Sequence, residues 1–265
     1  MNRLIFCDID GTIIDGSRGM IDVSIKTKYA FEQLKANGDY VIISSGRNKF
    51  LLSDEIKQTK PSGYILCNGA YGEFNNQMIY SYHFDDKALE AIINIPSQSS
   101  GFYMLESLDN VYIRSLKDES FINFMNQWGM MPDCYIESSS LNGNYHVAMI
   151  GFLENENIKK IIDNLNKYTE VIPHNNTFSF DINVKNITKG TGVIKMREYL
   201  DIPIEDTYCF GDGLNDLDML KNVGHPIIMA NAHKDLNNYN FEVTDDVIDD
   251  GFYNYLVNNK LIKAL

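Results

Sequence analysis

The first dozen residues restrict the possible folds more than any other part of the chain. A run of four apolar residues, 4–7, leads directly into Asp8, Ile9, Asp10 and Gly11. A short apolar run closed by an Asp-Gly turn predicts a buried strand. Side chains two residues apart leave a strand on the same side, so two carboxylates meet where this strand opens to solvent. Because such carboxylates repel each other, we expect a divalent cation with oxygen ligands, most often Mg2+, between them.

Composition limits both the size of the fold and the choice of partners. The 265 residues, 44% of them hydrophobic, suffice for one large domain or two small ones. The net charge of -13 argues against a nucleic-acid-binding surface and against docking on an anionic membrane. No apolar run approaches the ~20 residues of a membrane helix, and no secretory signal is recognisable. We therefore expect a cytoplasmic protein, and nothing in the sequence indicates its oligomeric state.

The chain changes its pattern twice. Up to about residue 83, short apolar strands alternate with helices, which predicts a parallel sheet covered on both faces. The next hundred or so residues mix helices with half-buried strands, as in an α+β domain, and then the first pattern returns. We predict an α/β fold with a doubly wound parallel sheet core, formed by residues 1–82 and 185–265. An α+β cap domain is expected to be inserted at residues 83–184.

Hydrophobic spacing and turn residues define the expected elements. In the predicted core the strands are 4–7, 40–43, 64–67, 208–210 and 226–230, and the helices are 24–37, 50–56, 190–200, 217–222 and 252–258. In the predicted cap the helices are 85–95, 119–128 and 155–165, and the strands are 102–105, 111–114, 145–150, 170–173 and 178–184. A hairpin with Asn75 and Asn76 at its turn should follow the third strand. The four cysteines are expected to be small buried thiols: Cys7, Cys67, Cys134 and Cys209.

Polar side chains gather where the expected core strands end. In an open α/β sheet, ligands bind at the carboxyl ends of the strands, so these side chains should converge. They are Asp8 and Asp10 after the first strand, Ser45, Gly46 and Arg47 after the second, Asn68 after the third, and Asp212, Asn215 and Asp216 after strand 208–210. Lys189 opens the helix with which the core resumes.

This set of residues suits phosphoryl transfer, which needs a nucleophile, neutralising charge and a group that handles the leaving-group proton. Asp8 can attack phosphorus and form an aspartyl phosphate, with Mg2+ between the two anions. Asp212 is the natural third oxygen ligand of the metal. Asp10 can protonate the leaving alcohol and later take a proton from water. The expected phosphate contacts are Ser45, the backbone near Gly46, and Lys189.

Four of these segments resemble the motifs of the haloacid dehalogenase superfamily of aspartate-nucleophile phosphatases. Residues 8–12 resemble its DxDGT motif, residues 45–47 its Thr/Ser motif, residues 189–190 its lysine motif and residues 211–216 its GDxxND motif. Ser45 stands where Thr is commoner in that family. Segments 67–70, 229–232, 243–244 and 250–251 resemble landmarks of the Cof-type sugar-phosphatase branch.

The resemblance implies a complete set of site residues. Mg2+ would be held by Asp8, the backbone carbonyl of Asp10, and Asp212, with Asp216 and Asn215 in support. The expected catalytic residues are Asp8, Asp10 and Lys189; the expected substrate-binding residues are Thr12, Ser45, Gly46, Arg47, Lys189 and Asn215; the expected metal-binding residues are Asp8, Asp10, Asp212 and Asp216. The resemblance also implies a large α/β cap inserted after the third core strand.

Together these observations predict a Mg2+-dependent phosphatase of small phosphomonoesters, with sugar phosphates as the favoured class. Phosphatases of pyridoxal phosphate or flavin mononucleotide come next. A phosphomutase, which would pass the phosphoryl group to a second sugar hydroxyl, is an alternative enzyme. A regulatory or binding protein that keeps the fold and the metal is the alternative outside catalysis. Two roles stay open: Arg47 could pair with a carboxylate instead of binding phosphate, and Asn68 could brace its loop.

Overall fold

Contacts within a computed structural model divide the chain into two units. The structure describes residues 2–128, 135–137, 143–152, 158–174 and 178–265. The core unit comprises Met1–Arg47, Leu51–Tyr80 and Thr188–Leu265, and the insert unit comprises Asn48–Phe50 and Ser81–Ile187. These limits lie a few residues from the predicted ones, except that the prediction placed Asn48–Phe50 in the core. That the insert unit serves as a cap stays a prediction.

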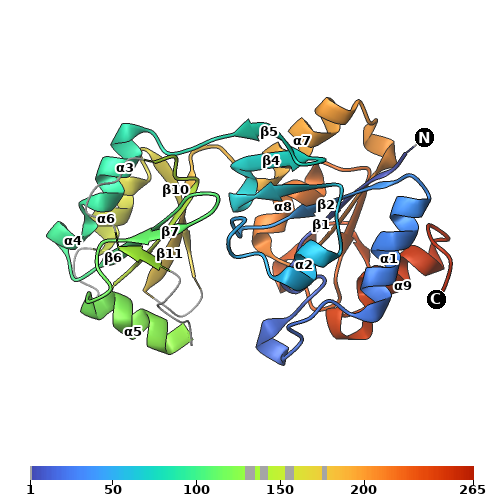
Figure 1. Cartoon of the computed structure of the whole chain (residues 1–265), viewed down its shortest axis with the longest axis horizontal. Helices are drawn as coiled ribbons and strands as arrows, with labels where there is room; N and C mark the ends of the chain where they lie inside the picture. Colours follow the sequence, from blue (N-terminus) through green and yellow to red (C-terminus); the bar gives the residue numbers. More distant parts are fainter. Residues whose placement is uncertain (1, 129–134, 138–142, 153–157, 175–177) are drawn as a thin grey trace. The chain divides into compact units, whose positions relative to one another are not determined.

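One eight-stranded sheet runs through the core unit (Figure 1). Its order is β14-β13-β12-β1-β2-β3-β4-β5. The strands are β1 (Leu4–Cys7), β2 (Tyr40–Ser44), β3 (Gly63–Leu66), β4 (Tyr71–Phe74), β5 (Gln77–Ser81), β12 (Thr207–Gly211), β13 (His225–Ile228) and β14 (Glu242–Val243). Pairing is parallel from β14 to β3, and β4 pairs antiparallel with β3. The parallel pairs bring the carboxyl ends of these strands to one edge of the sheet.

Helices cover both faces of this sheet. They are α1 (Ile25–Ala36), α2 (Asp54–Gln58), α7 (Lys189–Leu200), α8 (Leu217–Lys221) and α9 (Gly251–Asn258). Phe6 of β1 belongs to the buried cluster that includes Val193 of α7 and Met219 of α8. Phe210 of β12 pairs with Cys7, the residue after Phe6 in β1, so its side chain faces the opposite side of the sheet. There its ring centroid lies 4.8 Å from that of Phe252 in α9. The predicted doubly wound α/β core is confirmed.

Local sequence signals explain where several elements begin and end. The hydroxyl of Ser24 accepts a hydrogen bond from the Thr27 N–H, which caps α1. Thr188 caps α7 in the same way, with Thr191 completing a capping box. The hairpin between β4 and β5 turns at Asn75 and Asn76, as predicted, and both have positive φ, a conformation that asparagine tolerates.

The insert unit is built on a six-stranded sheet of order β10-β11-β9-β6-β7-β8. Its strands are β6 (Phe102–Glu106), β7 (Val111–Ile113), β8 (Tyr135–Glu137), β9 (Val147–Gly151), β10 (Thr169–Pro173) and β11 (Ser179–Val184). Its helices are α3 (Asp86–Ile93), α4 (Ile95–Gln98), α5 (Glu119–Trp128) and α6 (Ile158–Leu165). Neighbouring strands from β10 to β7 pair antiparallel, whereas β7 and β8 pair parallel.

Helices of the insert unit pack on opposite faces of its sheet. Tyr103 and Leu105 of β6 join a buried cluster with residues of α3 and α6, whereas Phe102 and Met104 join one with residues of α5. Successive β6 side chains therefore feed two separate apolar layers, as the alternation of a strand requires. The expected α+β character is present in this unit.

Several predictions differ from the structure in the described residues, and the short elements α4 and β14 were not predicted. The helix expected at 50–56 begins only at Asp54, because the Ser53 hydroxyl accepts from the Ile56 N–H and caps α2 there. The three-residue strand β8 was not predicted, since so short a run carries little periodicity. Cys134 and the first residues of the helix expected at 155–165 lie outside the described residues. None of the described helices has the length and apolarity needed to span a bilayer.

Candidate active site

The buried centre of the site is a lysine held between two aspartates. Lys189 at the start of α7 is 1% exposed. Its Nζ lies 2.5 Å from an oxygen of Asp8, at the end of β1, and 2.6 Å from an oxygen of Asp216. Burial lowers the pKa of Lys189, but the charges of Asp216 and Asp8 outweigh it and hold that pKa above its usual value. The ammonium group is therefore fixed in its charged form beside the expected nucleophile.

Asp216 also organises the loop that follows β12. Its second oxygen accepts hydrogen bonds from the backbone N–H groups of Asp212 and Gly213, at 3.0 and 2.9 Å. Asp216 is completely buried, so these bonds and Lys189 provide the partners that a buried carboxylate requires. With both of its oxygens engaged, Asp216 orients the loop, and Asp8 and Asp212 are better placed to offer oxygens to a ligand.

Three carboxylates converge at this point. Oxygen atoms of Asp8, Asp212 and Asp216 all lie within 4.8 Å of one another. Burial raises the pKa of Asp8 well above its usual range, although Lys189 opposes the shift. Burial, and then the charge of Asp216, raises the pKa of Asp212 to about 7. When all three carboxylates are ionised, they and the one ammonium leave two negative charges, which a single divalent cation would balance. The donor set, oxygen atoms only, fits Mg2+.

Gly11 allows the two aspartate-bearing loops to touch. Its φ is +83°, a region that favours glycine, and a Cβ there would lie only 2.1 Å from an oxygen of Asp212. The neighbouring Thr12 hydroxyl lies 3.4 Å from the other Asp212 oxygen. Any larger residue at position 11 would push the Asp212 carboxylate out of the cluster. The lack of space for a side chain thus explains why glycine occupies this position of the DxDGT segment.

Arg47 pairs with Asp10 in the structure. The guanidinium makes a two-pronged contact with the Asp10 carboxylate, with N···O distances of 2.6 and 3.0 Å. The Asp10 side chain is 57% exposed, so the pair lies at the open side of the cluster. Of the two roles left open for Arg47, pairing with a carboxylate is the one observed here, and phosphate binding by Arg47 stays a prediction.

The loop after β2 is held by hydrogen bonds of Ser45 and by contact with Asn68. Ser45 is buried, its hydroxyl accepts from the Arg47 N–H at 3.2 Å, and its carbonyl accepts from the Asn68 N–H at 3.1 Å. A Cβ on Gly46 would lie 3.0 Å from the Asn68 side-chain oxygen. Asn68 therefore supports this loop. Asn215, expected to bind substrate, is exposed.

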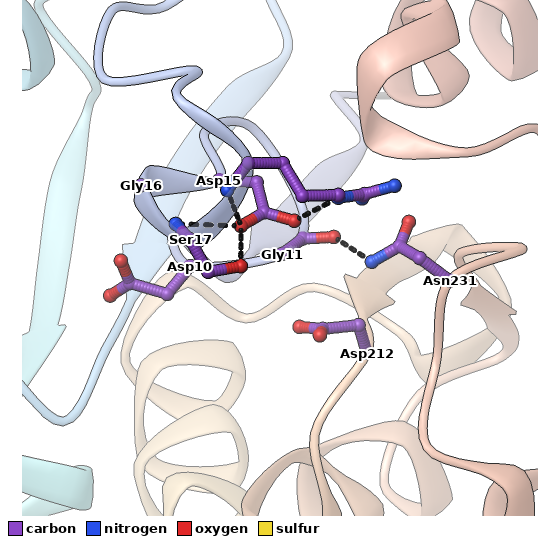
Figure 2. Close-up of a pocket in the computed structure, with 8 residues that line it drawn as sticks. Asp10, Gly11, Asp15, Gly16, Ser17, Asp212 and Asn231 are labelled. Atoms are coloured by element: carbon purple, nitrogen blue, oxygen red, sulfur yellow. Dashed lines mark hydrogen bonds and ion pairs between the residues drawn. The ribbon is translucent and has the colours of Figure 1, made fainter.

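A cavity of about 530 Å³ opens beside Asp10 and Asp212 (Figure 2). Its lining includes Asp15, Ser17, Arg18 and Asn231, to which the sequence analysis assigned no role. Asp15 and Arg18 form a local turn whose Arg18 guanidinium also reaches Asp246 at 2.8 Å. Asn231 belongs to segment 229–232, which resembles a landmark of the family. That resemblance is the signal from which Asn231 could have been found.

Comparison with known proteins agrees with this geometry. The model of the haloacid dehalogenase-like hydrolase family matches residues 5–256, and the chain therefore belongs to that family. The predicted resemblance is confirmed, and the chain is a phosphatase of this superfamily.

Several relatives match over nearly the full length. A Bacillus subtilis (strain 168) protein named "Putative phosphatase YkrA" is 28% identical over 260 residues, covering 94% of this chain and 95% of its own. The 5-amino-6-(5-phospho-D-ribitylamino)uracil phosphatase YcsE of the same organism is 21% identical over 253 residues, covering 94% and 92%. The structure of the HAD subclass IIB sugar phosphatase BT4131 superposes with a TM-score of 0.81 at 22% identity, covering 98% and 100%.

Proposed function

We propose that the protein hydrolyses small phosphomonoesters, sugar phosphates first among them, with Mg2+ and through an aspartyl phosphate on Asp8. The observation that carries this proposal is the cluster of Asp8, Lys189, Asp212 and Asp216, with Nζ–O distances of 2.5 and 2.6 Å. A protein that only bound a ligand would have no need for a nucleophile beside a buried ammonium. The similarity to the sugar phosphatase BT4131 and to the ribitylaminouracil phosphatase YcsE supports sugar phosphates and ribityl phosphates, respectively, as substrate classes to test.

In the first step, an Asp8 oxygen attacks phosphorus and the bond from phosphorus to the ester oxygen breaks. Asp10 gives its proton to the departing alcohol oxygen. Lys189 holds the Asp8 carboxylate in place and offsets part of the charge of the phosphate. In the second step, Asp10 takes a proton from water as the water oxygen attacks phosphorus. The bond between phosphorus and Asp8 breaks, which releases phosphate and restores the carboxylate.

A divalent cation, when bound, supplies the positive charge that lets an anionic nucleophile approach an anionic ester. Asp8 and Asp212 would hold it through their side chains, with the Asp10 backbone carbonyl, and Asp216 would support them. Ser45, Gly46 and Thr12 are proposed to contact the phosphate, together with Asn215 and Arg47. We further propose that the insert unit acts as the cap that selects the leaving group, and that the protein works in the cytoplasm.

The direct test is hydrolysis of an aryl phosphate with Mg2+ by the wild type and by Asp8→Asn. We expect kcat to fall by about 10⁴-fold or more, because the covalent route is lost. A matched control, Asp54→Asn, changes an aspartate whose side chain is 84% exposed and should leave kcat unchanged. Wild-type turnover by Asp8→Asn would contradict the mechanism.

A panel of phosphorylated metabolites, including hexose phosphates, pyridoxal phosphate and flavin mononucleotide, would then rank the substrates. With a hexose 1-phosphate, free phosphate as the product supports hydrolysis, whereas an isomerised sugar phosphate would indicate a phosphomutase. Measurable ligand binding without turnover on any ester would indicate a binding protein.

A further inference from the structure

The side chain of Asn231 connects the loop after β1 with two other segments of the core unit. Asn231 follows β13, and its Nδ2 donates a 2.7 Å hydrogen bond to the carbonyl of Gly11. Its Oδ1 accepts a 3.0 Å hydrogen bond from the N–H of Val247. Figure 2 shows the Asn231 amide directed at the Gly11 carbonyl, with Asp212 beside them. The amide thus connects three separate loops of the chain.

The Gly11 carbonyl is a sensitive place for such a contact. Gly11 lies between Asp10 and Thr12, and its α-carbon lies so close to the Asp212 carboxylate that no Cβ fits between them. A hydrogen bond to its carbonyl fixes the plane of the peptide bond that follows Gly11. A rotation of that plane would change both the direction of the Asp10 segment and the space left for Asp212.

Segment 229–233, which contains Asn231, also contacts the loop that carries Asp212. The N–H of His233 donates a 2.8 Å hydrogen bond to the Asp212 carbonyl, and the N–H of Met229 donates a 3.1 Å hydrogen bond to the Gly211 carbonyl. Segment 229–233 therefore contacts the loop after β12 through its backbone and the loop after β1 through Asn231. The spacing between Asp10 and Asp212 depends on this segment.

Only asparagine suits both contacts at this position. Its amide presents one donor and one acceptor in a rigid planar group. Aspartate could still accept from the Val247 N–H, but its second oxygen would face the Gly11 carbonyl, so two acceptors would oppose each other. That carboxylate would also add a negative charge next to a cluster that is already acidic.

We propose that Asn231 is a positioning residue that sets the distance between the Asp10–Gly11 segment and Asp212, and with it the affinity of the site for Mg2+. The inference rests on the proposed function. The hydrogen bonds of the Asn231 side chain go to Gly11 and Val247, not to the expected nucleophile. It acts through the Gly11 carbonyl, in the way that groups behind metal ligands commonly tune a site.

The test compares Asn231→Asp and Asn231→Ala with the wild type. We expect kcat for an aryl phosphate to fall by about 10- to 100-fold, with KM changed less than about threefold. Mg2+ affinity, measured by calorimetry without substrate, should fall by a similar factor of about 10. The aspartate variant isolates the Gly11 contact and carries the test if the alanine variant does not fold.

Asn254→Ala is the matched control. The Asn254 amide also bridges two groups, an oxygen of Asp245 and the carbonyl of Asp249, both at 2.8 Å, but it contacts neither aspartate-bearing loop. It should lower the melting temperature without changing kcat or Mg2+ affinity. If the Asn231 variants behave like this control, or keep kcat and Mg2+ affinity within about threefold of wild type, the proposal is overturned. Asp8→Asn is assayed alongside: turnover by that variant would overturn the proposed function instead.

Discussion

The core unit and the insert unit bury titratable side chains in opposite ways. In the core unit, Lys189 and Asp216 are almost inaccessible and form an ion pair of 2.6 Å. In the insert unit, Glu106 is 8% exposed, and its carboxyl group has no hydrogen bond or ion pair within the described part of the chain. Burial, with the charge of Asp181, raises the pKa of Glu106 to about 8. Burial lowers the pKa of His146 to about 4.

The difference separates two uses of a polar group in the interior. The core unit keeps the buried Lys189 charged by placing Asp8 and Asp216 beside it, at a cost in desolvation that the proposed chemistry justifies. The insert unit keeps Glu106 and His146 neutral near pH 7, because burial disfavours their charged forms more than the surroundings favour them. Replacing a buried titratable residue should therefore destabilise the core unit by removing an ion-pair partner. In the insert unit, the same kind of replacement should change how the free energy of unfolding depends on pH.

The largest effect is expected for Lys189→Met. Removing one partner of a buried ion pair leaves Asp8 and Asp216 uncompensated, so the free energy of unfolding should fall by about 3–5 kcal/mol. Urea denaturation in the presence of a chelator measures it. Lys57→Met is the control, because the side chain of Lys57 is 45% exposed and lies 3.9 Å from Asp54. A change below about 1 kcal/mol for Lys189→Met would show that the pair is not needed for stability.

Glu106→Gln should change stability in a defined pH window. A raised pKa means that the folded state keeps its proton longer, so stability falls as pH rises from about 4.5 through about 8. The variant avoids that loss, and at pH 8.5 its free energy of unfolding should exceed that of the wild type by on the order of 4 kcal/mol. Near pH 4.5 the two should match in thermal unfolding. Glu137→Gln, at an exposed glutamate, should give no such gain. Parallel pH profiles for Glu106→Gln and the wild type would contradict the assignment.

His146→Gln should act in the opposite window and more weakly. Its lowered pKa means that the unfolded state takes up a proton first, so stability is lost as pH falls from about 6.5 towards about 4. The variant should flatten the acid limb of the stability profile. The His146 ring nitrogen lies 2.9 Å from the Ser81 hydroxyl, and a glutamine amide can keep a bond there. An unchanged acid limb would show that His146 does not control it.

The smallest effect on stability is expected for Arg47→Ala. The Arg47 and Asp10 side chains are 29% and 57% exposed, so solvent screens their pairing and its loss should cost less than about 1 kcal/mol. We expect turnover to change far more than stability, since Asp10 loses the group that orients it. Lys57→Ala, at a cation whose side chain is 45% exposed, provides the baseline. Equally small changes in turnover and in stability would show that Arg47 does not act in the site.

Most of the fold could be predicted from the sequence, for reasons that differ between elements. Strand β1 and helix α5 have the predicted ends, and α1 lies one residue inside its predicted limits at each end, because a continuous apolar run, a clear helical spacing or a serine cap marks them. Strand β8 was missed because three residues carry no period. The helix after β2 was placed too early because Ser53 was not recognised as a cap.

The candidate site divides in the same way. The grouping of Asp8, Lys189, Asp212 and Asp216 follows from strand ends and motifs, which the sequence displays. The pairing of Arg47 with Asp10 was left open because a guanidinium can reach several partners, and only coordinates choose among them. The bridge made by Asn231 joins residues 220 positions apart in the chain, a distance at which no local pattern operates.

The most direct test of the account is to trap the enzyme during turnover of a phosphate ester. Acid quenching followed by borohydride reduction converts an aspartyl phosphate to homoserine, which peptide mass spectrometry can locate. The account predicts conversion at Asp8 alone, dependent on Mg2+ and absent from Asp8→Asn. Conversion at another residue, or phosphate release at full rate with no trapped intermediate under any quench time, would contradict it.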